Sequence, residues 1–174
     1  VERRDVDGDG VEDRVLGFAN VDARLVGMDA ALRVILGRGW SLPAEAAWVR
    51  AQNLDQDKPL PEIPAAELRV GLRKEGWTPF SWWAETRSRL VASQGRIDPA
   101  FGEDRSPGHV TFDLRGGARL ADRLWLDLGV TNLLDKTYHE HLTREALLPA
   151  GDLRAGDEIP APGRTVYATF RWNL

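Results

Sequence analysis

The residues that decide the fold are Val166-Tyr167-Ala168-Thr169-Phe170-Arg171-Trp172-Asn173-Leu174, the last nine of a chain of 174. Apolar side chains stand at every second place, and those between them are mostly polar. A period of two sends successive side chains to opposite faces of a strand. The stretch therefore predicts a β-strand with one apolar face and one polar face.

Six segments upstream alternate in the same way. The clearer ones lie within 67–73, 82–89, 110–115 and 124–131, and the less regular ones at about 20–36 and 39–52. A helix stays open as an alternative for 20–36, because its Ala and Leu residues favour helices. With the terminal stretch, the pattern predicts about seven strands.

The connections between these strands alternate in length. Short turns are expected near 37–39, 74–76 and 121–122, and long loops at about 53–63, 95–107 and 135–160. Outer-membrane barrels have short periplasmic turns and longer external loops. We therefore predict an all-β fold, an antiparallel up-and-down segment of a transmembrane β-barrel. An odd number of strands cannot close such a barrel, so the predicted barrel is incomplete.

Tryptophan is frequent, with seven residues, and four of them fall beside the expected short turns or the C-terminus. These are Trp40, Trp77, Trp125 and Trp172. Aromatic girdles of this kind mark the membrane–water interface of barrels. Tryptophans in the core of a soluble β-sandwich are the alternative interpretation.

Composition excludes several other classes of protein. The net charge of -4 gives no reason to expect a nucleic-acid partner, and the absence of Cys excludes disulfides and thiolate metal sites. No apolar run approaches the length of a transmembrane helix. No nucleophile motif or phosphate loop is present, so we do not expect an enzyme. The first residue is Val, and we expect a truncation rather than processing.

A motif near the C-terminus resembles a known family. The stretch Leu128-Gly129-Val130-Thr131-Asn132-Leu133-Leu134-Asp135-Lys136-Thr137-Tyr138 resembles the "GvxNLfdkxY" signature of TonB-dependent receptors. A long loop and then Pro162-Gly163-Arg164-Thr165-Val166-Tyr167 follow it, as in that family. Leu134 and Leu174 stand where the family usually has Phe, and both keep the apolar character. Weaker similarity at 20–29 and 59–64 extends the resemblance to about 20–174.

The resemblance implies that the chain is the C-terminal part of a receptor barrel of about 22 strands. Residues 1–19 would form an acidic external loop and 20–174 the strands and loops. The family's plug and its TonB-contacting box would lie upstream. The intact receptor would sit in the outer membrane of a Gram-negative bacterium and contact its lipid. It would take up a small metal chelate or another scarce solute, such as a ferric siderophore, haem, cobalamin or copper, with energy relayed by TonB.

An acidic run near the N-terminus is a candidate calcium site. Its carboxylates are Asp5, Asp7, Asp9 and Asp13. Gly10 follows at the sixth place, as in calcium loops of the D-x-D-x-D-G type, but Leu16 occupies the place of the usual bidentate Glu. A solvated acidic loop is the alternative. No other cofactor is expected, and a soluble calcium-braced β-sandwich for binding or adhesion remains the second function, with a barrel enzyme or passive porin as the third.

Two histidines follow the signature. His139 and His141 face the same way on an extended chain, so the pair could ligate copper or zinc. A polar loop base is the alternative interpretation. His109 is isolated in sequence and receives no role.

We predict that a peptide of residues 1–19 binds calcium. Isothermal calorimetry should show binding heat at about 1 mM calcium, the weak end of the range for such loops. The D5N/D7N/D9N peptide is the control, and it should give no heat. Absence of heat from the unmodified peptide would contradict the calcium hypothesis.

Overall fold

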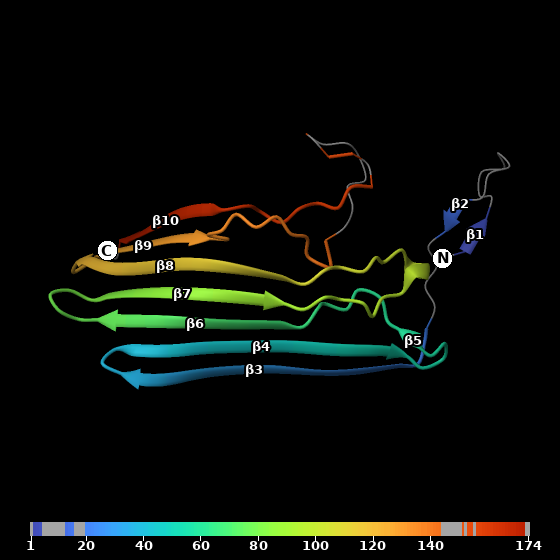
Figure 1. The fold of residues 1–174 in the computed structure, drawn as a ribbon, viewed down its shortest axis with the longest axis horizontal. Helices are drawn as coiled ribbons and strands as arrows, with labels where there is room; N and C mark the ends of the chain where they lie inside the picture. The colour runs from blue at the N-terminus through green and yellow to red at the C-terminus, as the bar shows by residue number, and fades with distance from the viewer. Residues whose placement is uncertain are drawn as a thin grey trace.

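The computed structural model describes residues 2–4, 13–15, 20–143, 151, 153–154 and 156–172 (Figure 1). Strands β1 (Glu2–Arg4) and β2 (Asp13–Val15) pair with each other in a separate two-stranded sheet. The main sheet comprises β3 (Ala23–Gly37), β4 (Trp40–Asn53), β5 (Lys58–Pro59), β6 (Glu67–Gly76), β7 (Trp82–Val91), β8 (His109–Ala121), β9 (Leu124–Thr131) and β10 (Thr165–Trp172). The 3-10 helix η1 (Pro99–Phe101) lies between β7 and β8. No helix in the described ranges is long and apolar enough to cross a membrane.

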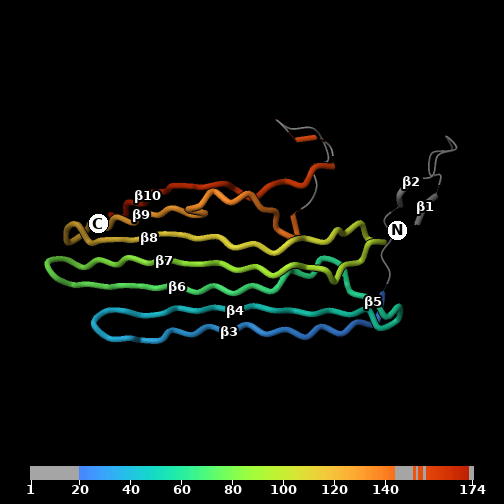
Figure 2. The backbone as a smooth tube through the Cα atoms, viewed as in Figure 1, coloured from blue at the N-terminus to red at the C-terminus, as the bar shows by residue number. Residues whose placement is uncertain are grey.

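The long strands of the main sheet lie in the order in which they occur in the chain. The order is β10-β9-β8-β7-β6-β4-β3, every pair is antiparallel, and β5 adds two residues beside β4. Figure 2 shows this as one open, up-and-down layer with β3 and β10 at its two edges. The predicted antiparallel fold and its seven long strands are confirmed. The helix alternative for 20–36 is wrong, since β3 pairs with β4 over nearly its whole length.

Short and long connections separate to opposite ends of the sheet, as predicted. The short-turn end carries turns 38–39, 77–81 and 122–123, and the long-loop end carries 54–66, 92–108 and 132–164 (Figure 1). One turn was placed wrongly. Residues 74–76 belong to β6, which pairs through Gly76 with Trp82 of β7. The chain turns instead at 77–81, where Pro79 has no N–H to donate to a ladder.

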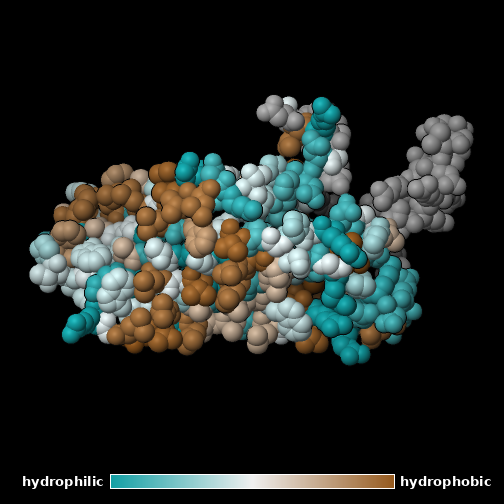
Figure 3. Space-filling view, viewed as in Figure 1, coloured by the Kyte–Doolittle hydropathy of each residue, from teal (hydrophilic) through white to brown (hydrophobic). Residues whose placement is uncertain are grey.

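The two faces of the sheet differ in chemistry. The outer face is defined here by the alternate residues Met28, Trp48, Val70, Leu90, Phe112, Leu128 and Phe170, most of them exposed. Figure 3 shows apolar side chains gathered over the strands, with hydrophilic ones over the long-loop end. The charged face is defined by Arg33, Glu45, Arg73, Glu85, Arg115, Asp127 and Arg171.

The buried residues are polar rather than apolar, which does not fit a soluble β-sandwich. Among the described residues, Ala51 is the only buried hydrophobic one. Apart from Gly71 and Gly129, the other buried residues of the described ranges are polar or charged: Ser41, Asn53, Glu85, Asp98, His109, Thr111 and Asn132. A sandwich buries apolar side chains between two sheets. A single layer with an exposed apolar face instead suits a barrel wall in lipid.

The four predicted tryptophans do lie at the short-turn end of the sheet, but one of them lies on the charged face and not on the outer face. Trp40, Trp77 and Trp172 lie exposed at the short-turn end. Trp125 lies at the same level, but it alternates with the apolar residues of β9 and shares the charged face with Asp127. Trp82, the first residue of β7, lies on the outer face at the short-turn end, where Trp125 was expected. The error arose because sequence position relative to a turn gives the level but not the face.

Candidate functional site: the charged face and the last long loop

The charged face is organised around Glu85 on β7. Its side chain is 3% exposed and accepts hydrogen bonds from Arg115 of β8 at 2.7 Å and from Arg73 of β6 at 3.2 Å. The neighbouring Arg87 lies 3.4 Å away on the same strand. Three guanidinium groups thus surround one carboxylate. Register places Arg73 and Arg115 opposite Glu85 on its two neighbouring strands, and Arg87 follows Glu85 by two residues on the same face of β7.

Further ion pairs extend this network across the wall. Arg33 of β3 pairs with Glu75 at 3.0 Å, and Glu75 also accepts from Arg73 at 2.7 Å. Nearer the long-loop end, Glu45 pairs with Arg87 at 3.1 Å. Glu67 pairs with Arg69 at 2.5 Å and with Arg89 at 2.7 Å. Alternation on five consecutive long strands therefore creates one connected polar surface of ion pairs.

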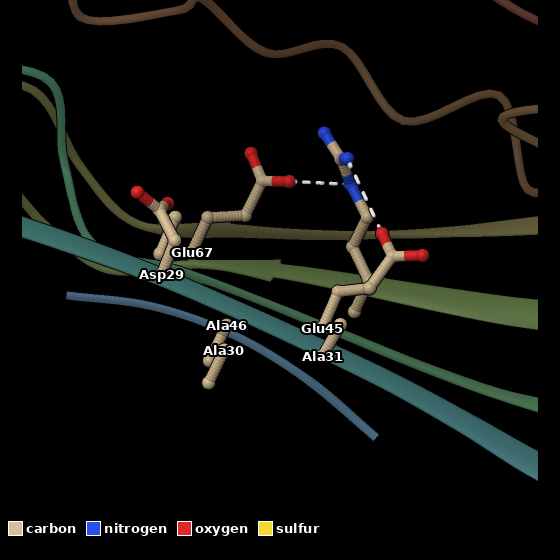
Figure 4. Close-up of a pocket in the computed structure, with 8 residues that line it drawn as sticks. Asp29, Ala30, Ala31, Glu45, Ala46 and Glu67 are labelled. Atoms are coloured by element: carbon tan, nitrogen blue, oxygen red, sulfur yellow. Dashed lines mark ion pairs between the residues drawn. The ribbon is translucent and has the colours of Figure 1, made fainter. Parts of the chain in front are cut away.

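A shallow hollow on this surface lies between β3, β4 and β6. Figure 4 shows the carboxylates of Asp29, Glu45 and Glu67 on one side of the sheet, with Ala30 and Ala46 on the other. Ion pairs to Arg69 hold Glu45 at 3.7 Å and Glu67 at 2.5 Å. Within the part of the chain that the structure describes, no group of three or more His, Cys, Asp or Glu could hold a metal ion.

The signature residues form the point where the chain leaves β9. Asn132 is buried and has a left-handed φ of 50°. Its Oδ1 accepts the Lys136 N–H at 2.9 Å, while its Nδ2 donates to the carbonyl of Lys136 at 2.8 Å and that of Pro162 at 3.4 Å. Leu133 donates its N–H to the carbonyl of Phe112 at 2.7 Å. Asn tolerates this backbone conformation, and its amide satisfies the backbone of the turn.

The second half of the signature closes the loop onto β10. Asp135, also at positive φ, accepts the Arg164 N–H at 2.7 Å through Oδ1. A Cβ at Gly163 would lie 2.9 Å from that same oxygen. Glycine at this place in the sequence suggests a backbone geometry closed to other residues. In the structure, a side chain at Gly163 would instead have to displace the Asp135 carboxylate, which closely approaches this position.

Tyr138 and Glu140 hold the start of the last loop against the wall. The ring of Tyr138 stacks on buried His109 of β8 at a centroid distance of 4.2 Å. Arg89 of β7 donates to both carboxylate oxygens of Glu140, at 2.5 and 3.1 Å. These hydrogen bonds lower the pKa of Glu140, and burial raises the pKa of Tyr138. The contacts anchor residues 136–142 to two strands of the barrel wall.

The two predicted metal histidines have different partners. His139 Nδ1 lies 3.1 Å from Glu158 Oε2. His141 Nδ1 lies 3.1 Å from Ser106 Oγ, and its Nε2 lies 3.7 Å from Glu103. Their role as metal ligands stays a prediction. Of the calcium candidates, Asp5, Asp7 and Asp9 lie outside the described residues, and only the backbone of Asp13 is described, in β2.

Glu103 joins the three long loops at the long-loop end. Its side chain is 10% exposed and accepts the N–H of Asp98 at 2.8 Å and that of Glu62 from the preceding long loop. His141 reaches it from the last loop. Lys58 pairs with Asp98 at 2.7 Å. Sequence reasoning did not identify Glu103 or His109, because their partners are distant in the chain.

Comparisons with known proteins agree on one family. The family described as "TonB dependent receptor-like, beta-barrel" matches residues 2–133. The chain is 33% identical to a structure described as "Copper transporter OprC", with a TM-score of 0.78 over 88% of this chain and 24% of that one. It is 17% identical to the ferric-catecholate import receptor Fiu from E. coli K12, with a TM-score of 0.59 over 95% of this chain and 22% of that one. At 17% identity, the second likeness shows the fold alone. No curated protein matches the sequence significantly.

We predict that Glu85→Gln destabilises the folded protein far more than Glu45→Gln. Removing the buried Glu85 carboxylate leaves Arg115 without a carboxylate partner, whereas Arg73 and Arg87 keep Glu75 and Glu45, so we expect a cost of about 1.5–3 kcal/mol. Glu45 is 44% exposed, so its loss should cost about 1 kcal/mol or less. Urea unfolding in lipid vesicles measures both. Equal costs for the two variants would contradict the assigned role of Glu85.

We also predict that the anchoring of residues 136–142 depends on pH. Because the pKa of folded Glu140 is lowered from its ordinary 4.5, its contribution is present above that value and lost as the pH falls below it. Glu140→Gln should reduce hydrogen-exchange protection of the Ala161 amide, which bonds the carbonyl of Tyr138, roughly fivefold at pH 7. The variant and the unmodified protein should converge at low pH. Asp104→Asn, at an exposed position with no ion pair or hydrogen bond in the described ranges, is the control, and a pH-independent difference would refute the assignment.

Proposed function

Because this chain belongs to the TonB-dependent receptor β-barrel family, we propose that it forms part of the wall of a receptor that actively imports a scarce solute. The family consists of outer-membrane transport receptors of Gram-negative bacteria, not enzymes. The observation that carries the proposal is the contrast between the two faces of the sheet. The exposed apolar face suits lipid, and the connected ion pairs suit the polar interior of a barrel.

The chain spans less than a quarter of the length of the two solved structures to which it is similar. We propose that residues 20–174 supply adjacent strands of a larger barrel, with 1–19 as an acidic external loop. The free edges of β3 and β10 would pair with other strands of that barrel, since unpaired backbone groups are costly in lipid. The plug and the contact with TonB would come from other parts of the receptor.

For the solute, we propose a metal ion or a small metal chelate. One of the two similar structures is a copper transporter, and the other is a ferric-catecholate import receptor. The copper transporter shares more sequence with this chain, so copper is the first solute to test. Ferric siderophores, haem and cobalamin follow. The proposal assigns no ligand residue to the described wall, which holds no candidate metal cluster.

Uptake by living cells tests this proposal. The gene that encodes this chain is deleted, and uptake of radioactive copper, a ferric catecholate, haem and cobalamin is measured at low concentration. We expect uptake of one of these solutes to fall to background and to return when the gene is restored. Deleting TonB should abolish the restored uptake.

Two outcomes would contradict the proposal. Uptake that depends on the gene but persists without TonB would indicate a passive porin. If deletion of the gene leaves the uptake of all four solutes unchanged, the proposal that the solute is a metal ion or metal chelate is wrong. A restored gene that carries Arg105→Gln, at an exposed loop position with no side-chain ion pair or hydrogen bond in the described part of the chain, is the matched control for expression.

A further inference from the structure

Two arginines on the outer face differ from the arginines on the charged face. Arg24 of β3 and Arg50 of β4 are exposed. Within the described ranges, neither side chain forms an ion pair or hydrogen bond. By contrast, each arginine on the charged face has a carboxylate within 4.0 Å: Arg33, Arg69, Arg73, Arg87, Arg89, Arg115, Arg119 and Arg171. In the part of the chain that the structure describes, these two exposed guanidinium groups on the outer face are therefore available to a partner.

Register places these two arginines close together. Arg24 pairs with Gln52, and Val26 pairs with Arg50, so the two arginines are diagonal neighbours on adjacent antiparallel strands. Diagonal neighbours on one face are about 7–8 Å apart, within reach of long side chains. Two carboxylates of the adjoining loop are already engaged. Asp57 accepts from Gln52 at 3.0 Å, and Asp55 accepts from the N–H of Asp22 at 2.9 Å.

The pair lies at the outer edge of the apolar band. On β3 the band runs from Leu36 to Val26, eleven residues whose ten steps span roughly 33 Å along the strand. A strand tilt of about 40° reduces this to about 25 Å, the expected height of the lipid-facing band. Arg24 follows directly beyond it, on the side of the long loops. In this family's orientation, with long loops outside the cell, that level is the headgroup region of the outer leaflet.

A tryptophan completes the arrangement. Trp48 is 44% exposed on the outer face, directly opposite Met28 and two residues below Arg50. Indole rings favour the boundary between lipid chains and headgroups. The surface therefore presents the indole ring of Trp48 at the level of the lipid acyl chains, with two cations next to it on the side of the long loops.

We propose that Arg24, Arg50 and Trp48 form a binding site for a phosphorylated lipid of the outer leaflet. The guanidinium groups hydrogen-bond phosphate oxygens in their fork geometry, and Trp48 packs against the adjoining sugar and acyl chains. The position beyond the outer end of the band selects lipopolysaccharide rather than the phospholipids of the inner leaflet. The site would anchor this part of the wall in its leaflet and is independent of the imported solute.

The receptor encoded by the complete gene, purified in mild detergent, tests the site. Binding of lipopolysaccharide is titrated for the unmodified protein, for R24Q/R50Q and for the charge-matched control R105Q/R123Q, whose exposed arginines lie in loop 92–108 and turn 122–123. We expect R24Q/R50Q to lose roughly tenfold or more in affinity and the control to lose little. R24K/R50K should restore part of the affinity. Circular dichroism checks that each variant keeps its sheet.

The source of the phosphate is resolved by three further probes. Dephosphorylated lipopolysaccharide should bind equally to the unmodified protein and R24Q/R50Q. Inorganic phosphate and vesicles of phosphatidylglycerol should compete weakly. Two results overturn the proposal. In the first, the unmodified protein and R24Q/R50Q bind lipopolysaccharide with equal affinity. In the second, R24Q/R50Q loses as much affinity for dephosphorylated lipopolysaccharide as for the phosphorylated form. If R24Q/R50Q does not fold, the single variants R24Q and R50Q are titrated instead, and the same results decide.

Discussion

Hydrocarbon offers no hydrogen-bond partner, so every backbone N–H and C=O group inside a bilayer must find one within the protein. The sheet satisfies this constraint by pairing each long strand from β4 to β9 with a neighbour on both sides. Two consequences follow from the pleat. One face must be apolar enough for lipid, and the other can carry the charges that would be costly there. The connected ion pairs around Glu85 show that the charged side chains of this face are partnered with one another.

Much of this architecture could be predicted from the sequence. A period of two gives both strand and face, so the seven long strands and the charged face emerged from alternation alone. Turn and loop lengths gave the two ends of the sheet. The errors occurred where one feature of the sequence was used to predict two properties, such as the level of a residue in the sheet and the face on which it lies. Trp125 is at the expected level but on the other face, and residues 74–76 have turn-forming character yet remain paired in β6.

Contacts between distant residues could not be predicted, because they depend on register. Glu85 contacts Arg115 thirty residues away, and Arg89 contacts Glu140 fifty-one residues away. His109 was passed over for the same reason, since its stacking partner Tyr138 is known only once the last loop folds back over β8. These contacts matter for function, because they hold the external loops of a receptor wall against a rigid sheet.

The lipid-facing wall is the central claim, and a single-cysteine scan of β6 tests it most directly. The chain contains no cysteine, so each introduced thiol reports its own position. In intact outer membranes, thiols at Leu68, Val70 and Leu72 should contact lipid and resist a water-soluble label, whereas those at Arg69 and Arg73 should face the polar interior. Quenching by brominated lipid of a fluorophore at each thiol should therefore alternate with a period of two. Equal quenching along β6, or stronger quenching at Arg69 and Arg73, would contradict the account.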